Sequence, residues 1–389
     1  MTAADIAVAS GAEVQFGASG ATYGGVISGA GALRISSGSL RLNGANSYTG
    51  MTSVSGGTLT LGASGSLSSA TTLTMSGGTF GLNGKTQTVA GLGGTGTSAV
   101  VALGAGRLTV NGGGTYLGTI TGTGSLTKQG TGTQTLTGAN TDSGGTSINA
   151  GTLVAGNNTA LGSGTATVTA GGTLEVGSGV TLANAIALNG GAITGTGTLS
   201  ADLVIADGGT LKPGNSPGTL HGTTATWGAG GIYAFEVSDF GLPAGTGWDL
   251  LSLTGTLALT ATALDPFLIR LTSLDADNTP GLAAHFHPTN PLNLKLVEFT
   301  AVTGFSASLF SVDSSGFQNL GAPSKAEALD SRAVGPGCWG SRTRAGRGPR
   351  RDGAFAPSRR FIPSPAVGMS PQVRRNRFGR GECPVRRFE

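Results

Sequence analysis

A glycine-punctuated repeat is the feature of this sequence that most constrains its fold. The stretch 135–156, TLTGANTDSGGTSINAGTLVAG, closely matches RLNGANSYTGMTSVSGGTLTLG, which ends at Gly62. Weaker relatives, such as TLTMSGGTFGLNG and ATVTAGGTLEVG, lie between and after the two copies. Self-similarity at a short period is typical of a solenoid, in which each unit buries its apolar face against its neighbours.

Each unit has the pattern of a strand, a glycine-containing turn and a second strand. Val168, Leu174 and Val176 alternate with polar residues, which places one apolar and one polar face on each strand. The intervening Gly-Gly and Asn-Gly pairs tolerate positive φ angles, and such turns also occur in antiparallel hairpins. Because small residues recur throughout, coils of about 20 residues stacked in parallel are favoured over hairpins. We expect an all-β fold, a single-stranded right-handed parallel β-helix, with at most a helical turn at 305–310.

Composition limits the alternatives to this fold. The 389 residues include 72 glycines but only 5% aromatic and 11% charged residues, so a thick globular core is excluded. Hydrophobic residues make up 38% of the chain, which is not typical of disorder. Residues 1–320 contain no cysteine, so this part does not depend on disulfides.

Charge divides the chain into two unlike parts. Residues 1–320 contain 8 Lys and Arg against 14 Asp and Glu, whereas residues 321–389 contain 15 against 5, with Cys338, Cys383 and 8 prolines. We therefore predict a β-solenoid over 1–225, terminal β-rich coils over 226–320, and a basic Arg/Pro-rich disordered tail over 321–389. Out-of-frame reading of a GC-rich gene would produce such a tail. The alternative is a basic arm for nucleic acid, but without a folded platform it offers charge and no base recognition, so no nucleic-acid partner is expected.

The order of motifs resembles the autotransporter-associated β-strand repeat of bacterial passenger domains. The pattern Gly-x-Leu, Leu-x-Gly-Ala-Asn, Gly-x-Thr and Gly-Thr-Leu covers 23–62 and 116–156, and the segments 209–220 and 245–259 resemble those that follow such repeats. The resemblance implies export to the cell surface, associated with the outer membrane. A departure is Asp142, which stands where the first copy has Tyr48 and predicts a more polar outer corner.

The sequence lacks the endings known for such proteins. It contains neither a translocator barrel nor the Pro-Glu-Pro anchor of a related group of repeat proteins, and its N-terminus does not resemble a secretory signal. No run approaches the ~18–20 apolar residues of a membrane-spanning helix. We therefore expect a fragment of a longer surface protein.

The residues that define the repeat are expected to be structural. Asparagines at solenoid corners typically cap turns or stack into ladders, and the glycines permit tight turns. The predicted structural positions are Gly44, Asn46, Gly50, Gly57 and Leu59 in the first copy, and Gly138, Asn140, Gly144, Gly151 and Leu153 in the second.

Two strings imitate catalytic or nucleotide-binding motifs. GNSPG (214–218) fits the nucleophile elbow G-x-S-x-G, but the oxyanion hole needs a backbone N–H after the serine and Pro217 has none. GLNGKT (81–86) resembles a phosphate loop, but Thr79 replaces the required glycine. Both are interpreted as turns.

Two further segments imitate metal sites. His285 and His287 would share one strand face but lack a third ligand, and 275–281 begins like a calcium loop without completing it. We predict no catalytic residue, no cofactor and no metal.

The favoured function is a non-enzymatic, exported surface solenoid that acts as a stalk or adhesin. Surface glycans or neighbouring cell surfaces would be its partners, bound through many weak polar contacts. The alternative is a polysaccharide-acting β-helix enzyme fragment, whose site would lie in 232–320, where aromatic residues, acids and His collect. A third possibility, ice binding, needs aligned Thr-x-Thr pairs, and their spacing in the sequence is irregular.

Overall fold

The computed structural model describes residues 3–288, 294–320 and 340–341. The chain divides into two units, Met1–Gly346 and Arg347–Glu389, and every described residue belongs to the first. The first unit is an all-β parallel solenoid of about 11 turns, which confirms the predicted fold class. Apart from Gly340 and Ser341, the predicted tail lies outside the described residues.

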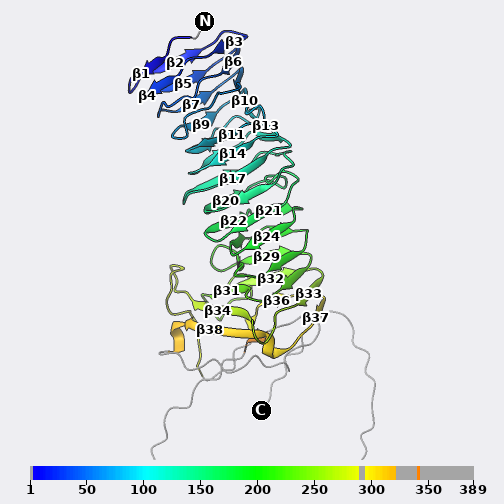
Figure 1. Ribbon diagram of the computed structural model, residues 1–389. Coiled ribbons are helices and arrows are strands. Elements are labelled where there is room, and N and C mark those ends of the chain that lie inside the picture. The colour runs from blue at the N-terminus through cyan, green and yellow to red at the C-terminus, as the bar shows by residue number, and fades with distance from the viewer. Residues whose placement is uncertain (1–2, 289–293, 321–339, 342–389) are drawn as a thin grey trace, which may run out of the picture. The chain divides into compact units, whose positions relative to one another are not determined.

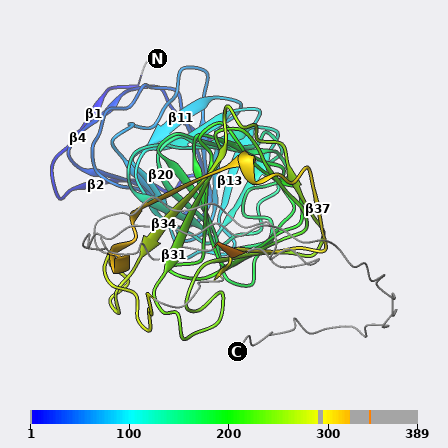
Figure 2. The same ribbon diagram turned by 90° about the horizontal axis from the view of Figure 1, so that it is seen from below.

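Strands of successive coils pair in parallel and in register (Figure 1). Ile6 lies beside Ile27, and Leu40 lies beside Leu59, so equivalent positions recur about 20 residues apart, as the repeat predicts. All strand pairs within the six sheets of the solenoid are parallel, so the hairpin alternative is not the arrangement found. Seen along the stack, the coils overlie one another (Figure 2).

Three sheets form the N-terminal half of the stack. They are a pair, β1 (Ile6–Val8) and β4 (Ile27–Gly29); a five-stranded sheet, β2 (Glu13–Phe16), β5 (Ala32–Ile35), β7 (Thr52–Val54), β9 (Thr72–Met75) and β12 (Gly91–Gly93); and a six-stranded sheet, β3 (Ala21–Tyr23), β6 (Ser39–Leu42), β8 (Thr58–Leu61), β10 (Thr79–Gly81), β13 (Val100–Gly104) and β16 (Thr119–Gly122).

Two longer sheets run through the C-terminal coils. The ten-stranded sheet contains β11 (Thr86–Val89), β14 (Arg107–Val110), β17 (Ser125–Lys128), β19 (Thr146–Ile148), β21 (Ala166–Thr169), β24 (Ile186–Asn189), β27 (Leu203–Ile205), β30 (Ala225–Trp227), β33 (Thr256–Leu259) and β37 (Ala301–Thr303). The nine-stranded sheet contains β15 (Gly114–Tyr116), β18 (Thr133–Leu136), β20 (Gly151–Ala155), β22 (Gly172–Val176), β25 (Ala192–Gly195), β28 (Thr210–Pro213), β31 (Ile232–Val237), β34 (Phe267–Ser273) and β38 (Phe310–Gly316).

The remaining elements are short. A second five-stranded sheet contains β23 (Thr181–Leu182), β26 (Thr198–Leu199), β29 (Thr219–Gly222), β32 (Leu250–Leu253) and β36 (Val297–Glu298), and β35 (Leu294–Lys295) pairs antiparallel with β39 (Gly340–Ser341). Two 3₁₀ turns follow, Ala307–Leu309 and Gln318–Leu320. The first lies within 305–310, where the sequence allows a helical turn, and the second was not expected from the sequence. No helix among the described residues is long and apolar enough to span a membrane.

The two-residue alternation of the sequence determines which side chains enter the core. In β22, Leu174 and Val176 are buried, whereas Thr173 and Glu175, which alternate with them, face outward and are only partly buried. The inward residues of successive coils form one continuous apolar core from Val8 to Phe317. Burial of apolar surface and main-chain bonding between coils therefore act together along the whole stack.

The core changes character in the C-terminal coils. Trp227 stacks on Phe267 at a centroid distance of 4.4 Å, and Tyr233 lies edge-on to Trp227 at 5.6 Å. Aliphatic residues fill most equivalent positions of earlier coils, such as Ile205 beside Trp227 in register. The predicted solenoid (1–225) and terminal coils (226–320) share the long sheets, and the division between them stays a prediction.

Candidate functional site

Each of the two repeat asparagines, Asn46 and Asn140, connects three successive coils through its side chain. Asn46 Oδ1 accepts a hydrogen bond from the backbone N–H of Ile27 at 2.8 Å, and its Nδ2 donates to the carbonyl of Ser66 at 2.7 Å. Ile27 lies in the preceding coil and Ser66 in the following one. Asn46 is 6% exposed, and the Ile27 N–H that it satisfies is buried.

Asn140 repeats this arrangement in the second copy. Its Oδ1 accepts from the Ile120 N–H at 2.8 Å, and its Nδ2 donates to the Ala160 carbonyl at 2.6 Å. Asn46 and Asn140 lie several coils apart, so they do not stack on each other. Each caps the backbone of both neighbouring coils, which is a structural use of the amide.

The repeat glycines stack on glycines of the preceding coil. A Cβ atom added at Gly44, Gly50, Gly138 or Gly144 would meet the carbonyl oxygen of the glycine directly beneath it. Those lower glycines are Gly25, Gly31, Gly118 and Gly124 respectively.

Gly57 and Gly151 carry an additional constraint. Their φ angles are +68° and +67°, and an added Cβ would also meet a glycine carbonyl oxygen of the coil before. Only glycine adopts that region without strain, so both turn geometry and coil spacing select it. The leucines that complete the repeat, Leu59 and Leu153, are fully buried.

The departure at position 142 lies inside the solenoid, not on an outer corner as expected. Asp142 is 2% exposed, and its Oδ2 has no hydrogen-bond partner among the described residues. Burial raises the pKa of its carboxyl to about 6. At the equivalent position Tyr48 is fully buried, with its hydroxyl 2.6 Å from Thr52 Oγ1. The second copy therefore exchanges a packed ring for a carboxyl group.

The GNSPG segment forms a turn within a polar cluster. Ser216 has a φ angle of 65°, and its Oγ donates to Glu236 Oε2 at 2.6 Å. Lys212 Nζ lies 3.1 Å from Glu236 Oε1. Strand β29, not a helix, follows the turn, so the structure does not form a nucleophile elbow.

A fourth member, Asp249, anchors this polar cluster. Its Oδ1 accepts from the Gly218 N–H at 3.0 Å, and its Oδ2 accepts from the Glu236 N–H at 2.9 Å. The residue is fully buried, and burial raises the pKa of its carboxyl well above the usual range. Lys212, Asn215 and Ser216 also line a shallow pocket of about 360 Å³ on the nine-stranded sheet.

The histidines do not share a strand face, contrary to the expectation. His285 lies in a loop with a φ angle of 54°, and its Nδ1 is 2.7 Å from Asp239 Oδ1. The pKa of the Asp239 carboxyl is held below its usual range, mainly by a hydrogen bond from the Gly241 N–H and to a smaller extent by the hydrogen bond with His285. Among the described residues, no group of three or more His, Cys, Asp or Glu is placed to hold a metal ion.

The other motif-like segments form local turns. Asn83 and Gly84 of the GLNGKT segment have positive φ angles, and β11 begins at Thr86. In the calcium-like segment, Asp275 Oδ1 accepts from the backbone N–H groups of Asp277 and Thr279 at 3.0 and 3.1 Å. These hydrogen bonds close a turn and engage the Asp275 carboxylate oxygen that a calcium ion would need as a ligand.

A buried lysine escaped sequence analysis. Lys128 is 1% exposed and occupies an inward position of the ten-stranded sheet between Val110 and Ile148. Its Nζ donates to the carbonyls of Gln129 at 2.6 Å and Gly130 at 2.8 Å, and reaches Ala150 at 3.3 Å. Desolvation lowers its pKa. The hydrophobic alternation at 126–128 is the signal that places it inward.

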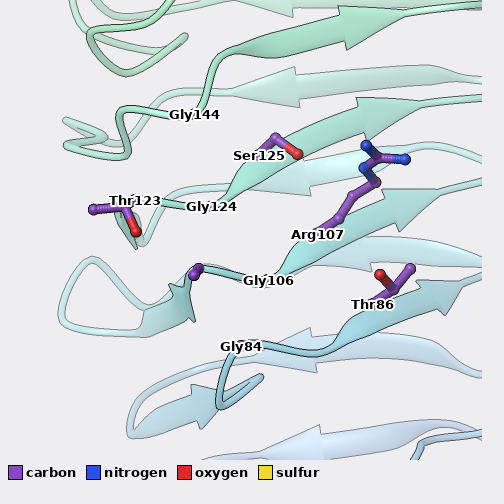
Figure 3. Close-up of a pocket in the computed structure, with 9 residues that line it drawn as sticks. Gly84, Thr86, Gly106, Arg107, Thr123, Gly124, Ser125 and Gly144 are labelled. Carbon is purple, nitrogen blue, oxygen red and sulfur yellow. The ribbon is translucent and has the colours of Figure 1, made fainter.

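A groove crosses the corner of four successive coils (Figure 3). It measures about 350 Å³ and is lined by Gly84, Thr86, Ala105, Gly106, Arg107, Thr123, Gly124, Ser125 and Gly144. Thr86, Arg107 and Ser125 begin three stacked strands and lie side by side in register. Sequence analysis did not identify this groove, because register brings together residues about 20 positions apart.

Comparison with known protein families matches two segments of the chain to one repeat family. The sequence model of the passenger-associated-transport-repeat matches residues 35–61 and 126–155. All ten predicted structural residues lie within these two segments. No curated protein matches the chain.

Proposed function

We propose that this chain, two segments of which match the passenger-associated-transport-repeat, is an autotransporter passenger-like protein that acts as an exported, non-enzymatic surface solenoid with a stalk and adhesive role. The repeat family and the fold support the stalk, and the family points to a surface or extracellular location. The name of the repeat family associates it with transport of passenger domains. That this chain is itself exported is part of our proposal.

The observation that carries the stalk role is the way in which each coil is attached to the next. Inter-coil backbone bonds run along every sheet, and Asn46 and Asn140 add side-chain bridges to both neighbours. Repeats that contact only their neighbours form an extendable scaffold. Threonines such as Thr133, Thr152 and Thr173 lie in register on successive coils and are exposed or partly exposed, so they provide repeated polar groups for weak multivalent contacts.

The polar cluster supports the non-enzymatic part of the proposal. A glycosidase needs two carboxyl groups that can exchange protons with substrate or water. Both oxygens of Glu236 are engaged by Ser216 and Lys212, and both oxygens of Asp249 accept backbone N–H groups. These acids hold the turn together and offer no unengaged oxygen to a substrate.

The test uses the purified full chain. We expect binding to one or more glycans on an array and to intact cells, and no release of new reducing ends from the polysaccharides of that array. Absence of binding to every glycan and cell surface would remove the adhesive role and leave the stalk. Release of reducing ends that is lost in Glu236→Gln would support the enzyme alternative instead.

A further inference from the structure

The groove at Arg107 combines one cation with hydroxyl groups. Arg107 is exposed, and Thr86 and Ser125 flank it in register on the adjacent strands (Figure 3). Thr123 contributes a third hydroxyl, which donates to the Gly104 carbonyl at 3.2 Å and remains able to accept. Coil stacking explains Gly106, Gly124 and Gly144 of the lining, and a positive φ angle explains Gly84.

The charge distribution along the chain favours anions at this groove. Residues 14–141 contain five Lys and Arg and no acid, whereas residues 142–320 contain three against twelve Asp and Glu. Within the described part of the chain, no carboxylate lies within 4.0 Å of the Arg107 guanidinium. The groove therefore lies in a positive region whose exposed arginine is available to a ligand.

The chemistry of the lining matches an acidic sugar better than a simple ion. A guanidinium binds a carboxylate or sulfate through two parallel hydrogen bonds. The neighbouring hydroxyls can donate to or accept from ring hydroxyls of the same ligand. The groove spans four coils, roughly 14 Å at ~4.8 Å per step, which suits an extended molecule. Large apolar side chains are absent from the lining, which disfavours a lipid.

We propose that this groove binds an acidic saccharide, with its anionic group on Arg107 and its hydroxyls on Thr86, Thr123 and Ser125. The inference rests on the proposed adhesive function and specifies its ligand class. The pocket at Lys212 is a poorer candidate for an anion, because Glu236 neutralises Lys212 and the surrounding half of the solenoid is acidic.

The experiment compares three ligands with the full chain by calorimetry. These are galacturonic acid oligosaccharides, sulfated galactose oligosaccharides and uncharged galactose oligosaccharides of the same length. We expect binding of one or both acidic ligands and much weaker binding of the uncharged one. The two acidic ligands distinguish carboxylate from sulfate recognition. Affinity should fall as salt rises, because the site is exposed.

Matched substitutions locate the site. Arg107→Met should lower the affinity about tenfold or more, since a charged hydrogen-bonding partner is lost. Arg41→Met is the control, because Arg41 is also exposed, on β6, but does not line the groove. Neither arginine contributes to the core, so both variants should keep the wild-type melting temperature.

Several outcomes would overturn the inference while leaving the proposed function intact. Equal binding of uncharged and acidic ligands would exclude recognition of the anionic group. An equal loss of affinity in Arg107→Met and Arg41→Met would show a diffuse effect of positive charge, without a binding site at Arg107. Binding of neutral glycans alone would keep the adhesive role and remove this groove from it. If no glycan or cell binds at all, the adhesive role and the inference both fail.

Discussion

The asparagine side chains show how one residue can connect three coils. Replacing Asn140 with Ala would leave the buried Ile120 N–H and Ala160 carbonyl without partners. An unsatisfied buried backbone group costs about 1–3 kcal/mol. We expect Asn140→Ala to lower the free energy of unfolding by at least that amount in a urea titration.

The matched control for this substitution is Asn215→Ala. Asn215 is exposed, and its replacement should change the free energy of unfolding by less than about 0.5 kcal/mol. Similar losses in the two variants would contradict the bridging role of Asn140. The Asn46→Ala variant tests the same role independently in the first copy.

Asp142 should make stability depend on pH in an unusual direction. Its folded-state pKa of about 6 lies above the ordinary value of 3.8, so the folded chain binds the proton more tightly than the unfolded chain. The contribution of Asp142 to the free energy of unfolding therefore falls as pH rises between these two values, by up to about 3 kcal/mol. Asp142→Asn should stabilise the protein at pH ~7.5 and change little at pH ~4.

Paired urea titrations of the wild type and Asp142→Asn at both pH values measure this effect. The difference in the free energy of unfolding between the two proteins separates the effect of Asp142 from that of the other acidic residues. An Asn variant that is equally stabilised at both pH values would indicate a packing effect. A variant that is less stable at the higher pH would contradict the sign of the shift.

At the scale of the coil, glycine sets the distance between neighbours. In Gly144→Ala the new Cβ would meet the Gly124 carbonyl oxygen, so the two coils would have to move apart. Overpacking of this kind costs about 1–3 kcal/mol. We expect a lower melting temperature by circular dichroism, with an unchanged β-sheet spectrum at low temperature.

Gly24→Ala is the control for coil spacing. An added Cβ at Gly24 meets nothing within 4 Å, and its φ angle is not in the left-handed region. The substitution should be neutral or slightly stabilising, because alanine restricts the unfolded chain. Equal destabilisation by Gly24→Ala and Gly144→Ala would argue that chain flexibility, not spacing, selects these glycines.

For the molecule as a whole, the sequence predicted the periodic features and missed those that depend on register. Leu174 and Val176 reveal their burial through alternation, and Gly57 through its place in a turn. Asp142 and Lys128 occupy inward positions that a local polarity argument assigns to the surface. Thr86, Arg107 and Ser125 lie about 20 residues apart, and only the pairing of β11, β14 and β17 brings them together.

A stack of coils should also respond to damage locally. Leu59 and Leu153 are equivalent in the repeat, and both are fully buried, so replacing either with Ala should cost about 2–5 kcal/mol. Because each coil contacts only its neighbours, the loss of stability should spread over a few coils.

Leu59→Ala should therefore speed hydrogen exchange mainly within 30–90, and Leu153→Ala mainly within 120–190. Each variant serves as the control for the other in mass-spectrometric exchange. A uniform acceleration over the described coils in both variants would mean that the solenoid opens as one cooperative body, and the coil-by-coil account of its stability would be wrong.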